Sequence, residues 1–155
     1  MEIIEVATGL RKTVIISKAE DEDFKVLTKS RYSFAWRSFK TQTKVYKLQI
    51  KGKDDILGVV GLIDFPDERR IEIKLLATSR ENIGKNKAYD RIAGCLIGFA
   101  CRIAVAQYGE DACVSLVPKT TLVKHYMTRY HMLNAGWQLY LEGKALNQIL
   151  KEYIL

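Results

Sequence analysis

The stretch "IEIKLLATSRENIGKNKAYDRIAG" (residues 71–94) decides the fold, because it joins a strand to a turn and then to a long helix. Its first part, residues 71–78, is rich in β-branched and other apolar residues, which is typical of a buried strand. Its second part, residues 81–94, places polar and flexible residues ahead of a segment with helical periodicity. A strand, a turn and a crossover helix in this order predict a mixed α/β sheet that binds a ligand at the strand's carboxyl end.

The crossover helix is expected over residues 86–108. Gly94 and Gly98 lie four residues apart on one stripe of it, and each costs about 1 kcal/mol of helix propensity relative to alanine. A close approach of the helix to a sheet would explain why both are tolerated. The neighbouring stripe is apolar at steps of three or four, with Ile92, Leu96, Phe99, Ile103 and Ala106.

Strands are also expected before and after this unit. Residues 44–52 alternate polar and apolar side chains, and residues 56–65 form a nearly continuous apolar run. A short polar turn separates residues 56–65 from 71–78, which indicates an antiparallel pair. After the crossover helix we expect a strand at 112–118, a helix at 119–131, a strand at 137–143 and an amphipathic helix at 145–154.

The first 43 residues are harder to interpret. Residues 2–7 and 13–17 have the composition of short strands, and the acidic residues 18–27 could open a helix. The aromatic residues of 31–40 are evenly spaced, which fits an extended segment or an irregular helical end, and both remain open. The whole chain is therefore expected to be one α/β (α+β) domain, 1–155, with a mixed sheet flanked by helices.

Composition limits the classes of function. The chain is 48% hydrophobic and 28% charged, as in a globular domain, and its net charge of +7 favours polyanionic partners. Nucleic acid, anionic lipid and a phosphate-rich cofactor all fit that charge. The three cysteines show no metal-ligand spacing, so no metal site is expected. We found neither a secretory signal nor an apolar run near the roughly 20 residues that cross a bilayer, so the cytoplasm is expected.

The turn itself suggests phosphate binding. A helix start leaves backbone N–H groups unpaired and carries a partial positive charge, and phosphate satisfies both. Gly84 lets an anion approach the backbone, Asn82 and Asn86 can cap or turn, and Lys85 and Lys87 add positive charge. The alternative is an ordinary strand-to-helix loop with an asparagine cap and solvated lysines.

The strand, turn and helix resemble those of the GCN5-related N-acetyltransferase (GNAT) superfamily. In that family a turn of pattern Q/R-x-x-G-x-G/A precedes a helix whose N-terminus holds the pyrophosphate of coenzyme A. The matching positions here are Glu81, Gly84 and Asn86, of which the central glycine agrees and the outer two depart. The resemblance implies the acyl-CoA N-acyltransferase fold, with a coenzyme-binding core at 44–155 and a variable acceptor side at 1–43.

A second part of the resemblance lies in "HYMTRYHMLNAGWQLYLEG". The family has a tyrosine followed by a glycine–aromatic pair, as in Y-x-K-x-G-F, and here Tyr126 takes the tyrosine position. His131 and Met132 stand where the glycine and the aromatic residue would be. Lys119 stands where the family often has an asparagine that touches the pantetheine arm.

These matches imply roles for particular residues. Tyr126 would be the general acid that protonates the leaving thiolate, although buried tyrosines with a bonded hydroxyl are also common. Glu72 would be the general base, acting through water, or else a solvent-facing glutamate on an alternating strand; His125 is another candidate base. The residues expected to bind the cofactor, acetyl-CoA, are Leu76, Ala77, Thr78, Asn82, Ile83, Gly84, Lys85, Asn86, Lys87 and Lys119, with the backbone N–H groups around Leu76 and Ala77 holding the thioester oxygen.

The function expected from the resemblance is transfer of an acetyl group from acetyl-CoA to a primary amine. Two alternatives remain: a degenerate GNAT fold that binds a partner without catalysis, and a basic protein associated with nucleic acid or tRNA. The second is less favoured because the basic residues are scattered and form no arginine cluster or aromatic platform. No membrane partner is expected. The final helix could pack on a second copy of the chain to form a homodimer.

Overall fold

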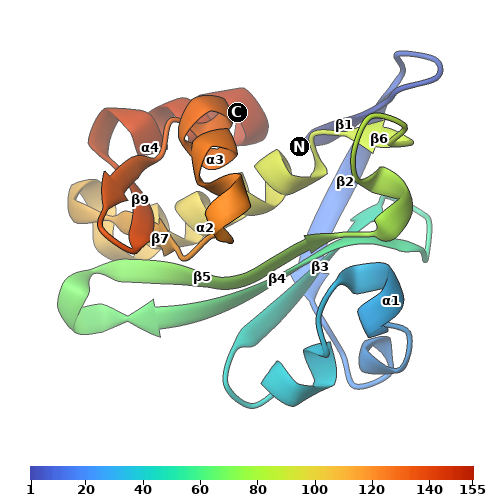
Figure 1. Ribbon diagram of the computed structural model, residues 1–155, viewed down its shortest axis with the longest axis horizontal. Coiled ribbons are helices and arrows are strands. Elements are labelled where there is room, and N and C mark those ends of the chain that lie inside the picture. The colour runs from blue at the N-terminus through green and yellow to red at the C-terminus, as the bar shows by residue number, and fades with distance from the viewer.

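A computed structural model describes all of residues 1–155 and confirms the expected fold class, a mixed α/β sheet flanked by helices (Figure 1). The sheet has nine strands in the order β6-β1-β2-β3-β4-β5-β7-β9-β8. Only β5 and β7 pair in parallel, as the crossover predicts. The strands are β1 (Glu2–Glu5), β2 (Arg11–Lys18), β3 (Lys44–Ile50), β4 (Ile56–Phe65), β5 (Arg70–Thr78), β6 (Tyr89–Asp90), β7 (Cys113–Leu116), β8 (Leu133–Ala135) and β9 (Gln138–Glu142).

Helices cover both faces of the sheet (Figure 1). On one face lies the long crossover helix α2 (Ile92–Tyr108), with α3 (Val123–Tyr130), α4 (Gly143–Ile149) and the π-helical turn Leu150–Ile154. The main core lies between this layer and the sheet. The short helix α1 (Lys29–Tyr32) lies on the other face, where Tyr32 and Trp36 are buried in a smaller core against β3, β4 and β5.

Strand β5 contains a bulge at Lys74. Leu75 pairs with Gly61 and Ile73 pairs with Leu62, so Lys74 has no partner on β4. A bulge places two successive side chains on one face and then resumes the alternation. Ile71 and Ile73 face the α2 layer, and so does Leu76, whereas Leu75 and Ala77 pack toward the smaller core.

Beyond the bulge the sheet splits. Strands β5 and β7 pair only over Arg70–Ile73 and Cys113–Leu116, after which β7 ends and β5 continues to Thr78. The edge of β5 over residues 74–78 therefore has no neighbouring strand on the β7 side. An unpaired strand edge in the interior of a sheet offers backbone donors and acceptors to a ligand.

The N-terminus of α2 differs from the expected one. The helix begins at Ile92 and not at residue 86, because residues 89–90 form β6 and pair with β1. Arg91 precedes the helix with a φ of 80°, a conformation that ends the strand and turns the chain into the helix. The polar turn at Gly84 is thus separated from the helix start by a loop and a short strand.

The two glycines of α2 approach other helical residues and not the sheet, so that expectation was wrong. A Cβ atom at Gly94 would lie 2.1 Å from the Tyr153 ring, and one at Gly98 would lie 3.1 Å from the Ile154 side chain. The C-terminal π-helical turn therefore packs directly on the backbone of α2.

Helix α2 with its following turn, Ile92–Asp111, is long and apolar enough by composition to cross a membrane, unlike what the sequence analysis indicated. Its most apolar window is 56% buried inside the domain. The fold uses it as the central core helix, which explains its composition.

Smaller elements also depart from expectation. The acidic residues 18–27 form only a 3-10 turn at Asp23–Lys25, since Asp23 accepts a hydrogen bond from Lys47 on β3 at 2.8 Å and is held against the sheet. For the aromatic segment, where an extended and a helical form both remained open, the helical form is found, with α1 followed by a 3-10 turn at Trp36–Phe39. Strands β6 and β8 were not predicted.

Candidate active site

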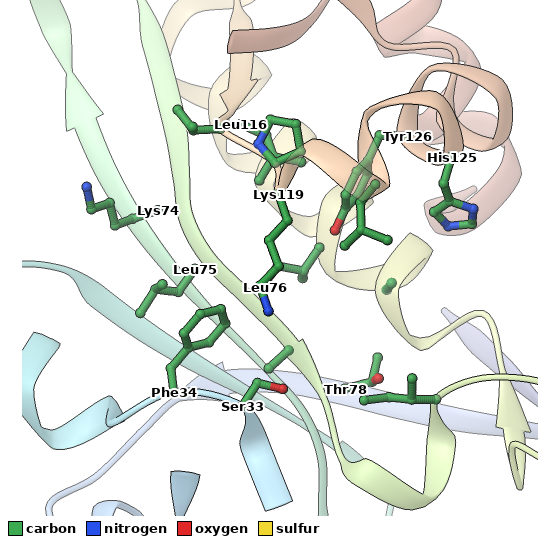
Figure 2. Close-up of a pocket in the computed structure, with 16 residues that line it drawn as sticks. Ser33, Phe34, Lys74, Leu75, Leu76, Thr78, Leu116, Lys119, His125 and Tyr126 are labelled. Atoms are coloured by element: carbon green, nitrogen blue, oxygen red, sulfur yellow. The ribbon is translucent and has the colours of Figure 1, made fainter. Parts of the chain in front are cut away.

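A cavity of about 380 Å³ lies where β5 and β7 separate (Figure 2). Leu76 and Thr78 of β5 form one wall, and Leu116 at the end of β7 faces them. The side chain of Tyr126, from α3, closes the cavity on the helical side with its hydroxyl directed inward (Figure 2). Predicted site residues from distant parts of the sequence therefore line one space.

The free edge of β5 presents backbone groups to this cavity. Ser79 donates its N–H to the carbonyl of Leu57 at 2.9 Å, so it faces β4. Because successive peptide groups of a strand point to opposite sides, the N–H groups of Leu76 and Thr78 point away from β4 toward the open edge. The N–H of Ala77 points to β4, and this residue lines the cavity by its side chain.

A second cavity, of about 290 Å³, lies in front of the α2 N-terminus. The backbone N–H groups of Ile92, Ala93 and Gly94 donate to no group of the chain, and the helix has no side-chain cap. Ile92 and Ala93 line the cavity. Three free amides and the positive end of a 17-residue helix are features that favour an anion, and we therefore call this space the anion site.

The two cavities are adjacent. They share Thr78, Ile83, Ala93 and His125 as lining residues. One is a mainly apolar cleft beside a strand edge, and the other lies next to it at a helix start. That shape fits an extended ligand with an apolar arm and a phosphate group.

Cationic side chains surround the anion site. Lys87 lines it and pairs with Asp90 at 2.8 Å, and Arg129 lines it while donating to Glu152 at 3.0 Å. Lys87 lowers the pKa of the Asp90 carboxyl, chiefly through this hydrogen bond. The positive charge is therefore present but partly compensated within the protein.

The predicted phosphate turn serves several purposes. Ile83 and Gly84 line the anion cavity, with Gly84 at a φ of 83° that glycine adopts without strain. Asn82 is buried and bonded within the loop, donating to Ser79 Oγ at 2.8 Å and accepting from the Tyr89 N–H at 2.8 Å. Its side chain fixes the loop and has little capacity left for a ligand.

Three residues of the turn lie apart from the cleft. Lys85 and Asn86 line a shallow hollow beside the β1–β2 hairpin and neither of the two cavities. Glu81 pairs with Arg31, which also donates two hydrogen bonds to Asp55 at 2.9 and 3.0 Å. The hydrogen bond from Arg31 lowers the pKa of the Glu81 carboxyl, so this acid is neutralised by a partner on α1.

Tyr126 has the environment expected of a proton donor. Burial raises the pKa of its phenol, and no hydrogen bond within the protein contributes to that shift. Its ring packs edge-on against His125, with centroids 5.7 Å apart. A tyrosine with a raised pKa remains protonated at neutral pH, so it can donate to a group in the cavity. Its role as the acid stays a prediction.

Glu72 lies outside the cavity. It pairs with Arg70 at 3.3 Å, and Arg70 donates to Ser115 Oγ at 2.7 Å, on the part of β5 that still pairs with β7. A role as the base would require water to connect it to the cavity. That role also stays a prediction.

The far side of the cavity is formed by the segment after α1. Ser33 and Phe34 line it together with Lys74 and Leu75, whose side chains lie on the opposite side of β5 from Tyr126 (Figure 2). Lys119 extends from the segment after β7 across the cavity, with its Nζ 5.9 Å from the centre of the Phe34 ring.

The sequence analysis missed the residues at the true helix start. The family's R-x-x-G spacing occurs in the segment Arg91–Gly94, which forms the first turn of α2. Leu96 stands at the last position of that pattern. Its glycine, however, packs against Tyr153. The sequence signal that could have located the helix start is Arg91, which directly precedes the apolar residues of the helix.

Comparison with known proteins places the fold. No model of a protein family and no curated protein sequence matches the chain. Several solved structures do match its fold. A GNAT family acetyltransferase from Elizabethkingia anophelis with acetyl-CoA bound has 13% sequence identity and a TM-score of 0.59, with 83% of this chain and 97% of that chain covered.

Two further structures give the same result. An IAA acetyltransferase from Bacillus cereus is 15% identical with a TM-score of 0.57, covering 84% of this chain and 99% of that one. A chain of the NatC complex bound to Gag peptide and coenzyme A is 13% identical with a TM-score of 0.60, covering 83% and 98%. The chain has the fold of the GNAT acetyltransferases, as the resemblance implied.

Proposed function

We propose that the protein is an N-acyltransferase that uses acetyl-CoA and acetylates a primary amine. One observation supports this above the others. The unpaired edge of β5 and the uncapped start of α2 border two adjacent cavities, which together suit an acyl-pantetheine arm and a pyrophosphate. The fold neighbours include structures with acetyl-CoA or coenzyme A bound.

Each part of the cleft has a task in this proposal. Acetyl-CoA supplies the activated acetyl group when bound. The N–H of Leu76 donates to the thioester oxygen, where negative charge develops as the amine attacks. The amides of Ile92 and Ala93, with Lys87 and Arg129 nearby, hold the diphosphate.

Tyr126 gives its proton to the departing thiolate. The phenol lies in the same cavity as Leu76, and burial keeps its pKa above the ordinary value. Lys119 lies along the boundary between the pantetheine side and the Phe34 side. We expect the reaction to take place in the cytoplasm.

The test is ligand-dependent stability with acetyl-CoA, coenzyme A and heparin as three separate ligands. A ligand at 100 times its dissociation constant adds about 2.7 kcal/mol to the free energy of unfolding. For a chain of this size that raises Tm by about 5–11 °C. The proposal requires stabilisation by both coenzymes and none by heparin at the same ionic strength.

A matched pair of lysines tests the site itself. Lys87→Gln removes a charge that lines the anion cavity, and Lys85→Gln removes one two residues away that does not. Lys87→Gln is expected to weaken coenzyme A binding about three- to fivefold, the range for an exposed ion pair, and Lys85→Gln to leave it unchanged. Equal effects of the two variants would place the phosphates elsewhere.

The other outcomes identify the alternatives. Stabilisation by heparin alone, lost at raised salt, would favour a nucleic-acid partner. Coenzyme binding without acetyl transfer to any amine would favour a degenerate member of the fold that binds a partner.

A further inference from the structure

The acceptor side of the cavity carries positive charge and no negative charge. Two of its sixteen lining residues are charged, Lys74 and Lys119, and none is an aspartate or a glutamate. Lys74 lies on the side of β5 that faces Phe34, and Lys119 reaches the Phe34 ring from the opposite wall (Figure 2). Lys119 therefore reaches the space between Phe34 and Leu76, whereas the exposed Lys74 lies at the outer edge of the cavity with its ammonium directed away from Phe34 (Figure 2).

Neither lysine is neutralised by the protein. The carboxylates closest along the chain have other partners: Glu72 and Glu68, near Lys74, pair with Arg70, and Asp111, near Lys119, pairs with Arg69. Lys74 and Lys119 form no ion pair in the structure, whereas the lysine that lines the neighbouring anion cavity, Lys87, does. Their charge is therefore available to a ligand.

We propose, on the basis of the acetyltransferase function above, that the acceptor is a primary amine that also carries an anionic group, a carboxylate or a phosphate. Lys119 binds the anionic group, Lys74 adds positive charge at the outer edge of the cavity, and Phe34 covers the short apolar chain between the anionic group and the amine. Diamines and other polycations are rejected, because a second positive charge would face two unpaired lysines without a carboxylate to receive it.

The same charges help the reaction. An amine attacks only in its neutral form, and nearby positive charges disfavour the protonated form of an amine. The lysines therefore lower the pKa of the bound acceptor amine. This effect supplies reactive amine in a cavity whose walls hold no carboxylate base.

The experiment compares acceptors that differ only at the end remote from the amine. With acetyl-CoA fixed, acetyl transfer and binding to the coenzyme A complex are measured for 4-aminobutyrate, 4-aminobutanamide and 1,4-diaminobutane, which end in a negative, a neutral and a positive group. A fourth compound, 3-aminopropyl phosphate, distinguishes phosphate from carboxylate. The expected order of kcat/KM and of affinity is anionic, neutral, cationic, with a step of about fivefold or more for each unit of charge.

Variants test whether the two lysines cause that order. Lys119→Gln should reduce the preference for the anionic over the neutral acceptor about fivefold, and Lys74→Gln, which removes a charge only at the outer edge of the cavity, should reduce it less. Lys124→Gln removes an exposed lysine of α3 that lines neither cavity and should not change it. Equal binding of all acceptors, or preference for the diamine, would overturn the inference.

The two proposals fail in different ways. If the acyltransferase proposal is wrong, the stability assay will show no binding of coenzyme A, and this can be seen before any acceptor is added. If only the inference about the acceptor is wrong, coenzyme A will bind, but the order of kcat/KM and affinity among the acceptors will be reversed, or all acceptors will be equal.

Discussion

Substitution of Gly94 by alanine should destabilise the protein, although alanine is the better helix former. The new Cβ would lie 2.1 and 2.2 Å from two carbons of the Tyr153 ring, closer than any normal contact. The ring has no room to move, because it is 2% exposed and lies between the Arg91 guanidinium, 4.6 Å from its centre, and the Tyr130 ring at 6.2 Å.

The magnitude follows from two opposing terms. Overpacking a rigid core site costs roughly 1–3 kcal/mol, and a contact this short lies at the upper end. Replacing glycine by alanine inside a helix stabilises the helix by about 1 kcal/mol. The net loss is about 2 kcal/mol in the free energy of unfolding, which lowers Tm by about 4–8 °C for a domain of this size. Urea unfolding and a thermal scan measure it.

Gly98→Ala is the matched control, one helical turn further on. Its Cβ would lie 3.1 Å from two carbons of the Ile154 side chain and 3.2 Å from Tyr153 Cβ, so a shift of a few tenths of an ångström relieves the contacts, and the change should cost much less than Gly94→Ala. In a Tyr153→Leu background the ring is absent and Gly94→Ala should become neutral or stabilising. If Gly94→Ala proves as stable as the wild type, or costs the same in both backgrounds, the packing argument is wrong.

Three further results are expected. Tyr126→Phe should lower kcat about a hundredfold, as for loss of a general acid, while the Kd for coenzyme A stays the same; equal activity would end the role of Tyr126 as the acid. Arg31→Met should lower the free energy of unfolding by about 0.5–1 kcal/mol at pH 7, because Arg31 lowers the pKa of Glu81 in the folded protein. The stabilisation by this pair is present above the pKa of Glu81 in the unfolded chain and is lost as the pH falls through its pKa in the folded protein. The difference in unfolding free energy between the wild type and the variant should therefore be smaller at pH 3 than at pH 7. Cys95 and Cys101 should resist a thiol reagent in the native protein, since burial raises the pKa of Cys95 to about 11 and that of Cys101 to about 12; labelling as fast as in urea would contradict their burial.

The central part of the fold could be predicted because local signals agree there. A continuous apolar run predicts the strand Ile56–Phe65, and a short polar turn marks its end. The spacing of apolar residues predicts the helix α2. Their order then restricts the sheet to one parallel crossover. Tyr126 could be assigned to the same space because its position after the crossover is part of the family's pattern.

The helix start could not be predicted, because a long-range pairing decides it. Tyr89 and Asp90 are recruited by β1, more than eighty residues earlier, and this prevents the helix from beginning at residue 86. Consequently the prediction named Gly84 and Lys87 but not Ile92, although all three line the same cavity. The environment of Glu72 was hidden for a similar reason, since its neighbour Ser115 belongs to β7.

The bulge at Lys74 determines which residues of β5 pack on the side of Tyr126 and which pack on the side of Phe34. Every residue of β5 after it has the opposite orientation to the one that uninterrupted alternation would give. If Lys74 took the place opposite Gly61 and the strand had no bulge, Leu75 and Ala77 would turn toward the side of Tyr126, and Leu76 would turn toward the side of Phe34. One unpaired residue in β5 therefore sets which side chains line each wall of the cleft.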